Sequence, residues 1–157
     1  MMPKTRLITS LLALLLWCNH SWSQSGAPGR VTITAARIGQ NLLLTAEIPA
    51  AAVGDSASAA NIRLQTLTRT LRDASRAFVL PEAAGCEQNA GDVIRHFGNA
   101  GSGPGISAGW EFICTDLDEL TTVGISLFSL IPVESMDGLT FPGGQQVVLA
   151  DNPVLKL

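Results

Sequence analysis

The segment that decides the fold is 106–114, which reads ISAGWEFIC. Its apolar residues Ile106, Trp110, Phe112 and Cys114 alternate with smaller or polar residues. A period of two places one side of a strand against a core and the other side toward solvent. The segment therefore predicts a half-buried strand in a sheet.

Cys114 ends this strand, and its predicted partner is Cys86, because the third cysteine, Cys18, lies in a predicted export signal. In an oxidising compartment an even pair of cysteines predicts a disulfide. The bond would close a loop of 29 residues and contribute about 3 to 4 kcal/mol on the chain-entropy account. The alternative is a metal site of Cys86, Cys114 and His96, which lacks an evident fourth ligand.

The first 23 residues have the three parts of a cleavable signal peptide. Lys4 and Arg6 supply positive charge, 7–17 is an apolar run, and 21–23 ends in small residues, so Gln24 is the predicted mature start. Eleven residues at about 1.5 Å each cannot cross a hydrocarbon layer about 30 Å thick. We therefore predict export to the periplasm without stable membrane insertion.

A lipoprotein signal at Cys18 is the alternative reading of this leader. Bulky Trp17 stands where such signals carry a small residue, so the prediction remains a signal peptide at 1–23. The rest of the chain, 24–157, is then expected to form one domain.

Removal of Lys4 and Arg6 leaves 8 basic residues against 13 acidic ones, a net charge of −5. Nucleic-acid binding depends on a surplus of cations that displace counterions from phosphates. The predicted domain has a deficit of cations, so nucleic acid is not an expected partner. Its 134 residues are enough to build a core without a structural metal.

The beginning of the predicted domain has the pattern of an antiparallel hairpin. Alternation over 31–36 and a β-prone run over 42–48 flank the turn residues 39–41. Pro49 ends the second strand, because proline cannot donate to a sheet ladder.

One amphipathic helix is predicted after this hairpin. Ser58 is its expected N-cap, and the helix must stop before Pro81. Apolar residues follow at helical spacing; they are Leu64, Leu67, Leu71, Ala74 and Phe78.

Arg69, Arg72 and Arg76 are expected on the outer side of this helix, with Asp73 one turn beyond Arg69. One interpretation is a docking surface for an acidic partner. The other is a solvated face whose long side chains cover apolar surface, and this second interpretation is the one we prefer.

The remaining segments are predicted from shorter patterns. Residues 86–97 are extended, 98–105 is a glycine-rich connector, and 123–131 is a strand that runs into a short helix. Two further strands, 136–141 and 145–149, flank the Pro-Gly-Gly turn.

These elements predict an α+β fold, with an antiparallel sheet of about six strands and one main helix packed on one face. The strands are grouped along the chain and do not alternate with helices. The sheet face that receives the helix is expected to include Val31, Leu43, Trp110 and Phe112.

The search for catalytic motifs finds no nucleophile elbow, no His-Glu-x-x-His and no phosphate-binding loop. His96 is the single histidine of 24–157, and it is interpreted as a polar strand residue. The carboxylates of Asp116, Asp118 and Glu119 lack the glycine and closing glutamate of a calcium loop. They are interpreted as a turn in which Asp116 or Asp118 caps backbone donors, so no catalytic residue is named and no enzyme is predicted.

Several motifs occur in a recognisable order. They are FVLPEAAGC at 78–86, WEFIC at 110–114, LFSLIP at 127–132, Gly144-Gln145, and a short terminal strand ending at Leu157. In this order the chain resembles the ZrgA-like periplasmic family, which is linked to zinc uptake in Gram-negative bacteria. The resemblance implies the compartment, the fold and the cysteine pair.

The chain departs from this family at three histidine-bearing features. Residues 26–30, 54–58 and 98–105 stand in their places and contain no histidine. Zinc prefers nitrogen and sulfur ligands, so no metal ligand can be carried over and no cofactor is predicted. The resemblance implies a non-enzymatic periplasmic protein that binds a partner protein or a ligand; the alternative is weak zinc binding by His96 with carboxylates.

Overall fold

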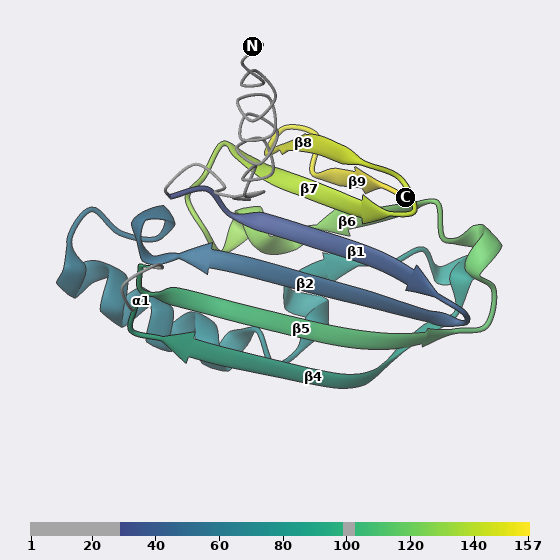
Figure 1. Cartoon of the computed structure of the whole chain (residues 1–157), viewed down its shortest axis with the longest axis horizontal. Coiled ribbons are helices and arrows are strands. Elements are labelled where there is room, and N and C mark those ends of the chain that lie inside the picture. The colour runs from purple at the N-terminus through teal and green to yellow at the C-terminus, as the bar shows by residue number, and fades with distance from the viewer. Residues whose placement is uncertain (1–28, 99–102) are drawn as a thin grey trace, which may run out of the picture.

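The computed structural model describes residues 29–98 and 103–157, which form two β-sheets and one main α-helix (Figure 1). The main sheet has six strands in the spatial order β4-β5-β2-β1-β7-β8. Their bounds are β1 Thr32–Ile38, β2 Asn41–Pro49, β4 Cys86–His96, β5 Gly105–Cys114, β7 Ser135–Phe141 and β8 Gln145–Leu149. The predicted α+β class, with about six strands and one main helix, is confirmed.

The sheet is antiparallel with one exception, because β1 and β7 run parallel. The hairpin β1–β2 and the strand β5 lie where the sequence predicted them. The long connection from β2 to the edge strand β4 carries the helix, and β5 then returns antiparallel to β4 and pairs with β2.

A second, three-stranded sheet was not predicted. It has the order β3-β6-β9, with bounds Phe78–Val79, Thr122–Ile125 and Val154–Lys156. Its strands are two to four residues long, and strands this short leave little periodicity to detect. The predicted strand-to-helix segment 123–131 is confirmed as β6 followed by the 3-10 turn η5, Ser126–Ser129.

Helix α1 spans Ala57–Thr70, and its N-cap is Ser56, not the predicted Ser58. The Ser56 hydroxyl accepts a 3.2 Å hydrogen bond from the backbone N–H of Ala59. Ser56 has extended backbone angles, whereas Ser58 already lies within the first helical turn. A cap needs non-helical geometry to aim its side chain at the first N–H groups.

The helix ends at Thr70, earlier than the pattern predicted. The Asp73 carboxylate accepts hydrogen bonds from the Ser75 N–H and hydroxyl and caps a separate 3-10 turn, η2 Ala74–Arg76. Such local side-chain bonds give the backbone an alternative to the helical ladder. The predicted apolar residues are nevertheless all buried, namely Leu64, Leu67, Leu71, Ala74 and Phe78.

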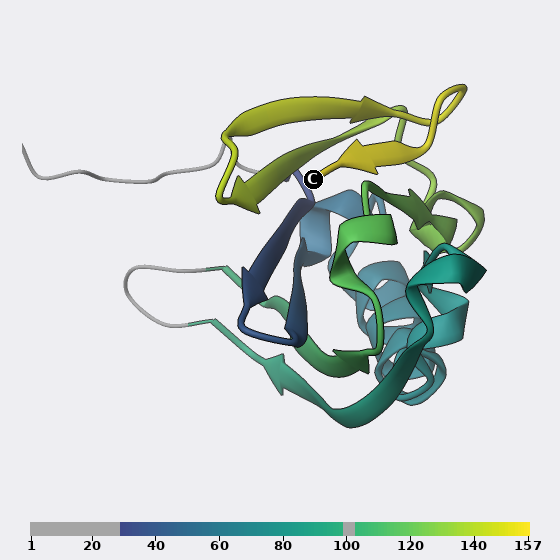
Figure 2. The same ribbon diagram turned by 90° about the vertical axis from the view of Figure 1, so that its right-hand side faces the viewer.

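Helix α1 packs on one face of the main sheet, and the small second sheet lies beside it (Figures 1 and 2). Trp110 of β5 is fully buried between α1 and the second sheet. Its ring stands edge-on to that of Phe78, with 5.1 Å between centroids and an interplanar angle of 81°. Val31 and Phe112 are buried with it as predicted.

Leu43 does not belong to this buried face, so its predicted position was wrong. Leu42 and Leu44 are fully buried, whereas Leu43 is 39% exposed. Three leucines in succession hide the phase of the strand, because alternate side chains must point to opposite faces.

The remaining turns are η1 Ala50–Ala52, η3 Glu82–Ala84 and η4 Leu117–Glu119. Within the described ranges no helix is both long and apolar enough to cross a membrane. The predicted signal peptide, Cys18 and the predicted mature start at Gln24 lie outside the described residues.

Candidate functional site

The predicted disulfide between Cys86 and Cys114 is confirmed, with an S–S distance of 2.04 Å. The two residues lie directly opposite each other on β4 and β5. The bond therefore links the edge strand β4 to β5 at the end of β4 that follows the turn η3. Its role is structural.

His96 lies at the other end of β4, opposite Gly105 of β5. Its Nδ1 is buried and has no hydrogen-bond partner within the described residues. Across the same residues, no three side chains among His, Cys, Asp and Glu come together in a group that could hold a metal ion. The residues that the structure describes therefore do not assemble the donor set of a tetrahedral zinc site.

The acidic cluster after β5 forms a turn, as the sequence predicted. Oδ1 of Asp116 accepts a 3.1 Å hydrogen bond from the backbone N–H of Asp118 and caps η4. Asp116, Asp118 and Glu119 are exposed or lie at the surface of this turn.

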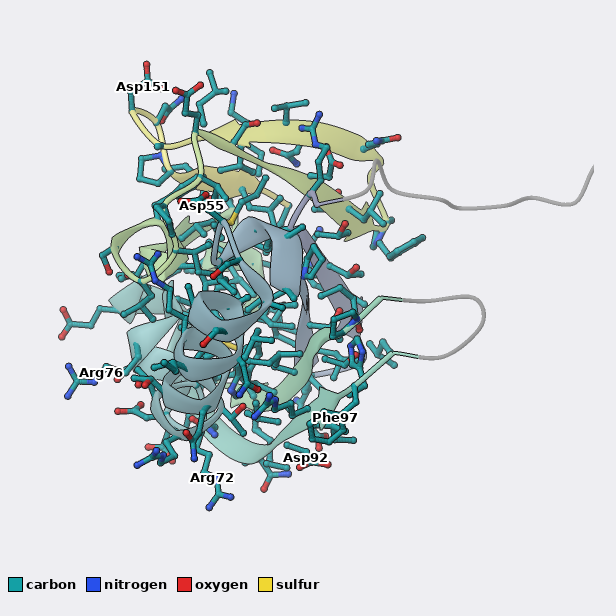
Figure 3. All side chains as sticks on the ribbon, turned by 90° about the vertical axis from the view of Figure 1, so that its left-hand side faces the viewer. Asp55, Arg72, Arg76, Asp92, Phe97 and Asp151 are labelled. Atoms are coloured by element: carbon teal, nitrogen blue, oxygen red, sulfur yellow. A yellow bond between two sulfur atoms is a disulfide. The ribbon has the colours of Figure 1, made fainter. Side chains whose placement is uncertain are left out.

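The three arginines do not share one helix face, because α1 ends before two of them. Arg69 lies in the last turn of α1, Arg72 follows the helix, and Arg76 belongs to η2. All three are exposed, and Figure 3 shows Arg72 and Arg76 pointing outward from separate places. Arg76 Nε lies 3.8 Å from Asp73 Oδ2, and the hydrogen bonds from Ser75 hold the pKa of Asp73 below its ordinary value.

The structure contains a pocket of about 470 Å³ that was not predicted from the sequence. It lies where the chain leaves η1, enters the first two turns of α1, and meets the loop before β7. Its walls come from four separate segments; they are Gly29, Ala51, Ala52, Gly54, Asp55, Ala59, Arg63, Pro132 and Val133.

Asp55 and Arg63 are the two charged members of this wall. No ion pair joins them in the part of the chain that the structure describes. A guanidinium group offers planar donors that match a carboxylate or phosphate, and a carboxylate accepts from ammonium or hydroxyl groups. The pocket can therefore offer both a donor set and an acceptor set to one small polar molecule.

The close fit of the η1–α1 loop depends on Gly54. A Cβ atom at this position would lie 2.5 Å from the backbone nitrogen of Ala60, closer than atoms can approach without a shift. The loop can therefore lie directly against the first turn of α1, and this contact places Asp55 at the pocket.

Two of the segments without histidine, 26–30 and 54–58, contribute residues to the wall of this pocket. Gly29 belongs to the first, and Gly54 and Asp55 belong to the second. Next to this wall, the Ala50 N–H donates a 2.9 Å hydrogen bond to the Pro104 carbonyl.

The signal for this pocket in the sequence is weak, because small residues and proline make most of its wall. Arg63 lies in the helical segment and Asp55 in the loop before it, and neither belongs to a recognisable binding motif. No family model matches the chain, and neither does any curated protein.

Proposed function

We propose that this chain is an exported, non-enzymatic protein that binds a small polar ligand in the pocket between α1 and the loop before β7. The observation that carries the proposal is the presence of both Asp55 and Arg63 in the wall of a pocket of about 470 Å³. Pockets for small ligands commonly fall between about 300 and 1,000 Å³. The volume and the two opposite charges together suit a small polar molecule.

The composition of the wall supports binding without catalysis. Covalent or acid–base chemistry needs a nucleophile with a base beside it, or a pair of titratable groups with different roles. The described wall holds alanine, glycine, proline and valine apart from Asp55 and Arg63. An arginine holds its proton throughout the physiological range, so the pair supplies charge and hydrogen bonds.

Binding can be tested by NMR chemical-shift titration with two probes, glycylglycine and inorganic phosphate. We expect one of them to shift resonances of Asp55, Ala59 and Arg63, and the Arg63→Gln variant to lose the effect. Arg69→Gln is the matched control, because Arg69 lies on the same helix outside the pocket wall. Shifts that persist in Arg63→Gln, or no shift with either probe, would contradict the proposal.

Export belongs to the same proposal and has its own test. Protein made with its own leader in a Gram-negative host should be recovered from the periplasm with Gln24 as its first residue. Intact mass spectrometry decides this, and recovery of uncleaved cytoplasmic protein would contradict export.

Weak zinc binding at His96 is the second function that we consider. One observation favours it: the Nδ1 atom of His96 is buried without a hydrogen-bond partner in the described residues, and an imidazole nitrogen is a zinc ligand. Melting temperature with added zinc or chelator separates the two functions. A zinc-induced rise that disappears in His96→Ala would support this second function, whereas no response to zinc supports the first.

A further inference from the structure

We infer that the face of the main sheet opposite α1 docks a protein partner whose surface is apolar at its centre and basic around it. We refer to this face as the outer face. Figure 1 shows it toward the viewer with α1 behind the sheet. The inference is independent of the pocket, which lies at the helix.

Two rows of cross-strand neighbours define the relevant part of the outer face. In the first row Glu111, Leu43, Ala36 and Phe141 follow one another across β5, β2, β1 and β7. Residues that pair directly point to the same face of a sheet. Since Leu43 points away from the buried leucines on either side of it, the whole first row points outward.

The second row lies beside the first, toward the β1–β2 turn. Glu87, Ile113, Asn41 and Ile38 follow one another across β4, β5, β2 and β1. These positions are two residues along from the first row on β5, β2 and β1, so their side chains also point outward.

The two rows place large apolar side chains close together on a solvent-exposed surface. Exposed fractions are 64% for Ile38, 57% for Phe141, 47% for Ile113 and 39% for Leu43. With Ala36 between them, these four residues form what we name the apolar patch. Contiguous exposed apolar surface in a soluble domain marks an interaction site, whereas single exposed residues do not.

The charged residues within the two rows are negative. Glu111 stands in the first row and Glu87 in the second, and neither row contains a basic residue. Glu111 is held in place, because its Oε1 accepts a 2.8 Å hydrogen bond from Asn41 Nδ2. The turn with Asp116 and Asp118 leaves β5 at the same end of the sheet.

This charge distribution selects the partner. Complementary charges around an apolar centre favour association, and like charges opposite each other oppose it. A second copy docked by the same patch would set Glu87 and Glu111 against the same residues. Anionic lipid or nucleic acid would meet the same repulsion. A protein surface with apolar side chains ringed by lysine or arginine fits.

The test uses a fluorescently labelled amphipathic helical peptide built from leucine and lysine, with binding measured by anisotropy. Two control peptides have the same length, one of leucine and glutamate and one of serine and lysine. We expect the leucine–lysine peptide to bind at least about tenfold more tightly than either control, since hot spots combine apolar anchors with matched charge. Equal binding of the serine–lysine peptide would overturn the inference, because the apolar patch would then contribute nothing.

Two variants test whether the peptide binds at the apolar patch. Leu43→Lys and Phe141→Ser should each weaken the leucine–lysine peptide by about tenfold or more. Ile62→Lys is the matched control, because Ile62 is 63% exposed on α1, on the other side of the molecule, and its affinity should stay within about twofold of the parent. Equal losses in all three variants, or none in the first two, would overturn the inference.

The variants must remain folded, and their melting temperatures report this. Both changed side chains are exposed, so both variants should melt close to the parent protein. Sedimentation of the parent chain tests the identity of the partner. A dimer that Leu43→Lys dissociates would overturn the choice of a basic partner in favour of a second copy.

Discussion

The indole N–H of Trp110 donates a 2.8 Å hydrogen bond to the backbone carbonyl of Leu71, and the donor is fully buried. Leu71 is the C-cap residue of α1, where a helix leaves carbonyl groups without partners. Trp110, near the centre of β5, therefore provides a hydrogen-bond donor for a carbonyl group at the end of the helix. This bond ties the position of α1 to the strand that decides the fold.

Trp110→Phe should lower the free energy of unfolding by about 1 to 3 kcal/mol. The substitution removes the indole donor that binds the Leu71 carbonyl, leaves that buried carbonyl group without this partner, and opens a space beside Phe78. Urea unfolding followed by far-UV circular dichroism measures the change. Ile62→Ala, on the exposed face of α1, is the control and should stay within about 0.5 kcal/mol. Equal stability of Trp110→Phe and the parent protein would show that the bond contributes little.

The start of α1 offers a comparison between two serines two residues apart. Ser56→Ala should cost about 1 kcal/mol, because its hydroxyl accepts from the Ala59 N–H. Ser58→Ala should have almost no effect, since Ser58 lies inside the first turn. Thermal unfolding of both variants measures the difference. The reverse order of effects would place the cap where the sequence pattern first suggested it.

These two positions show what the sequence could predict about the helix and what it could not. The spacing from Leu64 to Phe78 correctly gave the buried residues, because both a helix and the turns that follow it present them to the same core. The spacing could not give the end of the helix. That end depends on Asp73 binding the Ser75 N–H and on Trp110 reaching the Leu71 carbonyl, and the second contact spans 39 residues.

The candidate site was less predictable than the fold for a related reason. The disulfide could be predicted from the cysteine count and the predicted compartment, because Cys86 and Cys114 are the two cysteines outside the predicted signal peptide. The pocket depends on where four chain segments meet, and alanine and glycine in its wall carry no chemical signature. Gly54 contributes by the absence of a side chain, which a motif search does not detect.

Unreduced protein that begins at Gln24, and so lacks Cys18, should release no thiol that reacts with Ellman's reagent, since Cys86 and Cys114 are joined. Reduction, or the double change Cys86→Ala and Cys114→Ala, should lower stability by about 2 to 4 kcal/mol. The double variant is measured with and without reductant as a control for side effects of the reagent. Two reactive thiols in the unreduced, denatured protein would contradict the bond.

Asp73 should respond to acid through its link to Ser75. The Ser75 hydroxyl and N–H lower the pKa of the Asp73 carboxyl, with a smaller contribution from Arg76. A lowered folded-state pKa means that the carboxylate stabilises the fold above the ordinary aspartate pKa of about 3.9. This stabilisation is lost as pH falls through the folded-state value.

An NMR titration of the Asp73 carboxyl measures this directly. Its midpoint should lie below about 3.9, and Ser75→Ala should move it upward because both the Ser75 hydroxyl and its local geometry are affected. Arg76→Gln should produce a smaller upward shift, since its charge is the smallest of the causes. An unchanged midpoint in Ser75→Ala would show that the hydrogen bond does not set the pKa.

Leu43 and Leu44 are neighbours in sequence and lie on opposite faces of β2, so they test the assignment of the two faces. Leu44 is fully buried and Leu43 is 39% exposed. Leu44→Ala should cost about 2 to 5 kcal/mol, because the core cannot close over the lost volume. Leu43→Ala should stay within about 0.5 kcal/mol. Chemical denaturation of the two variants gives both values. A β2 register shifted by one residue would exchange the two results, and it would at the same time remove Leu43 from the apolar patch on the outer face.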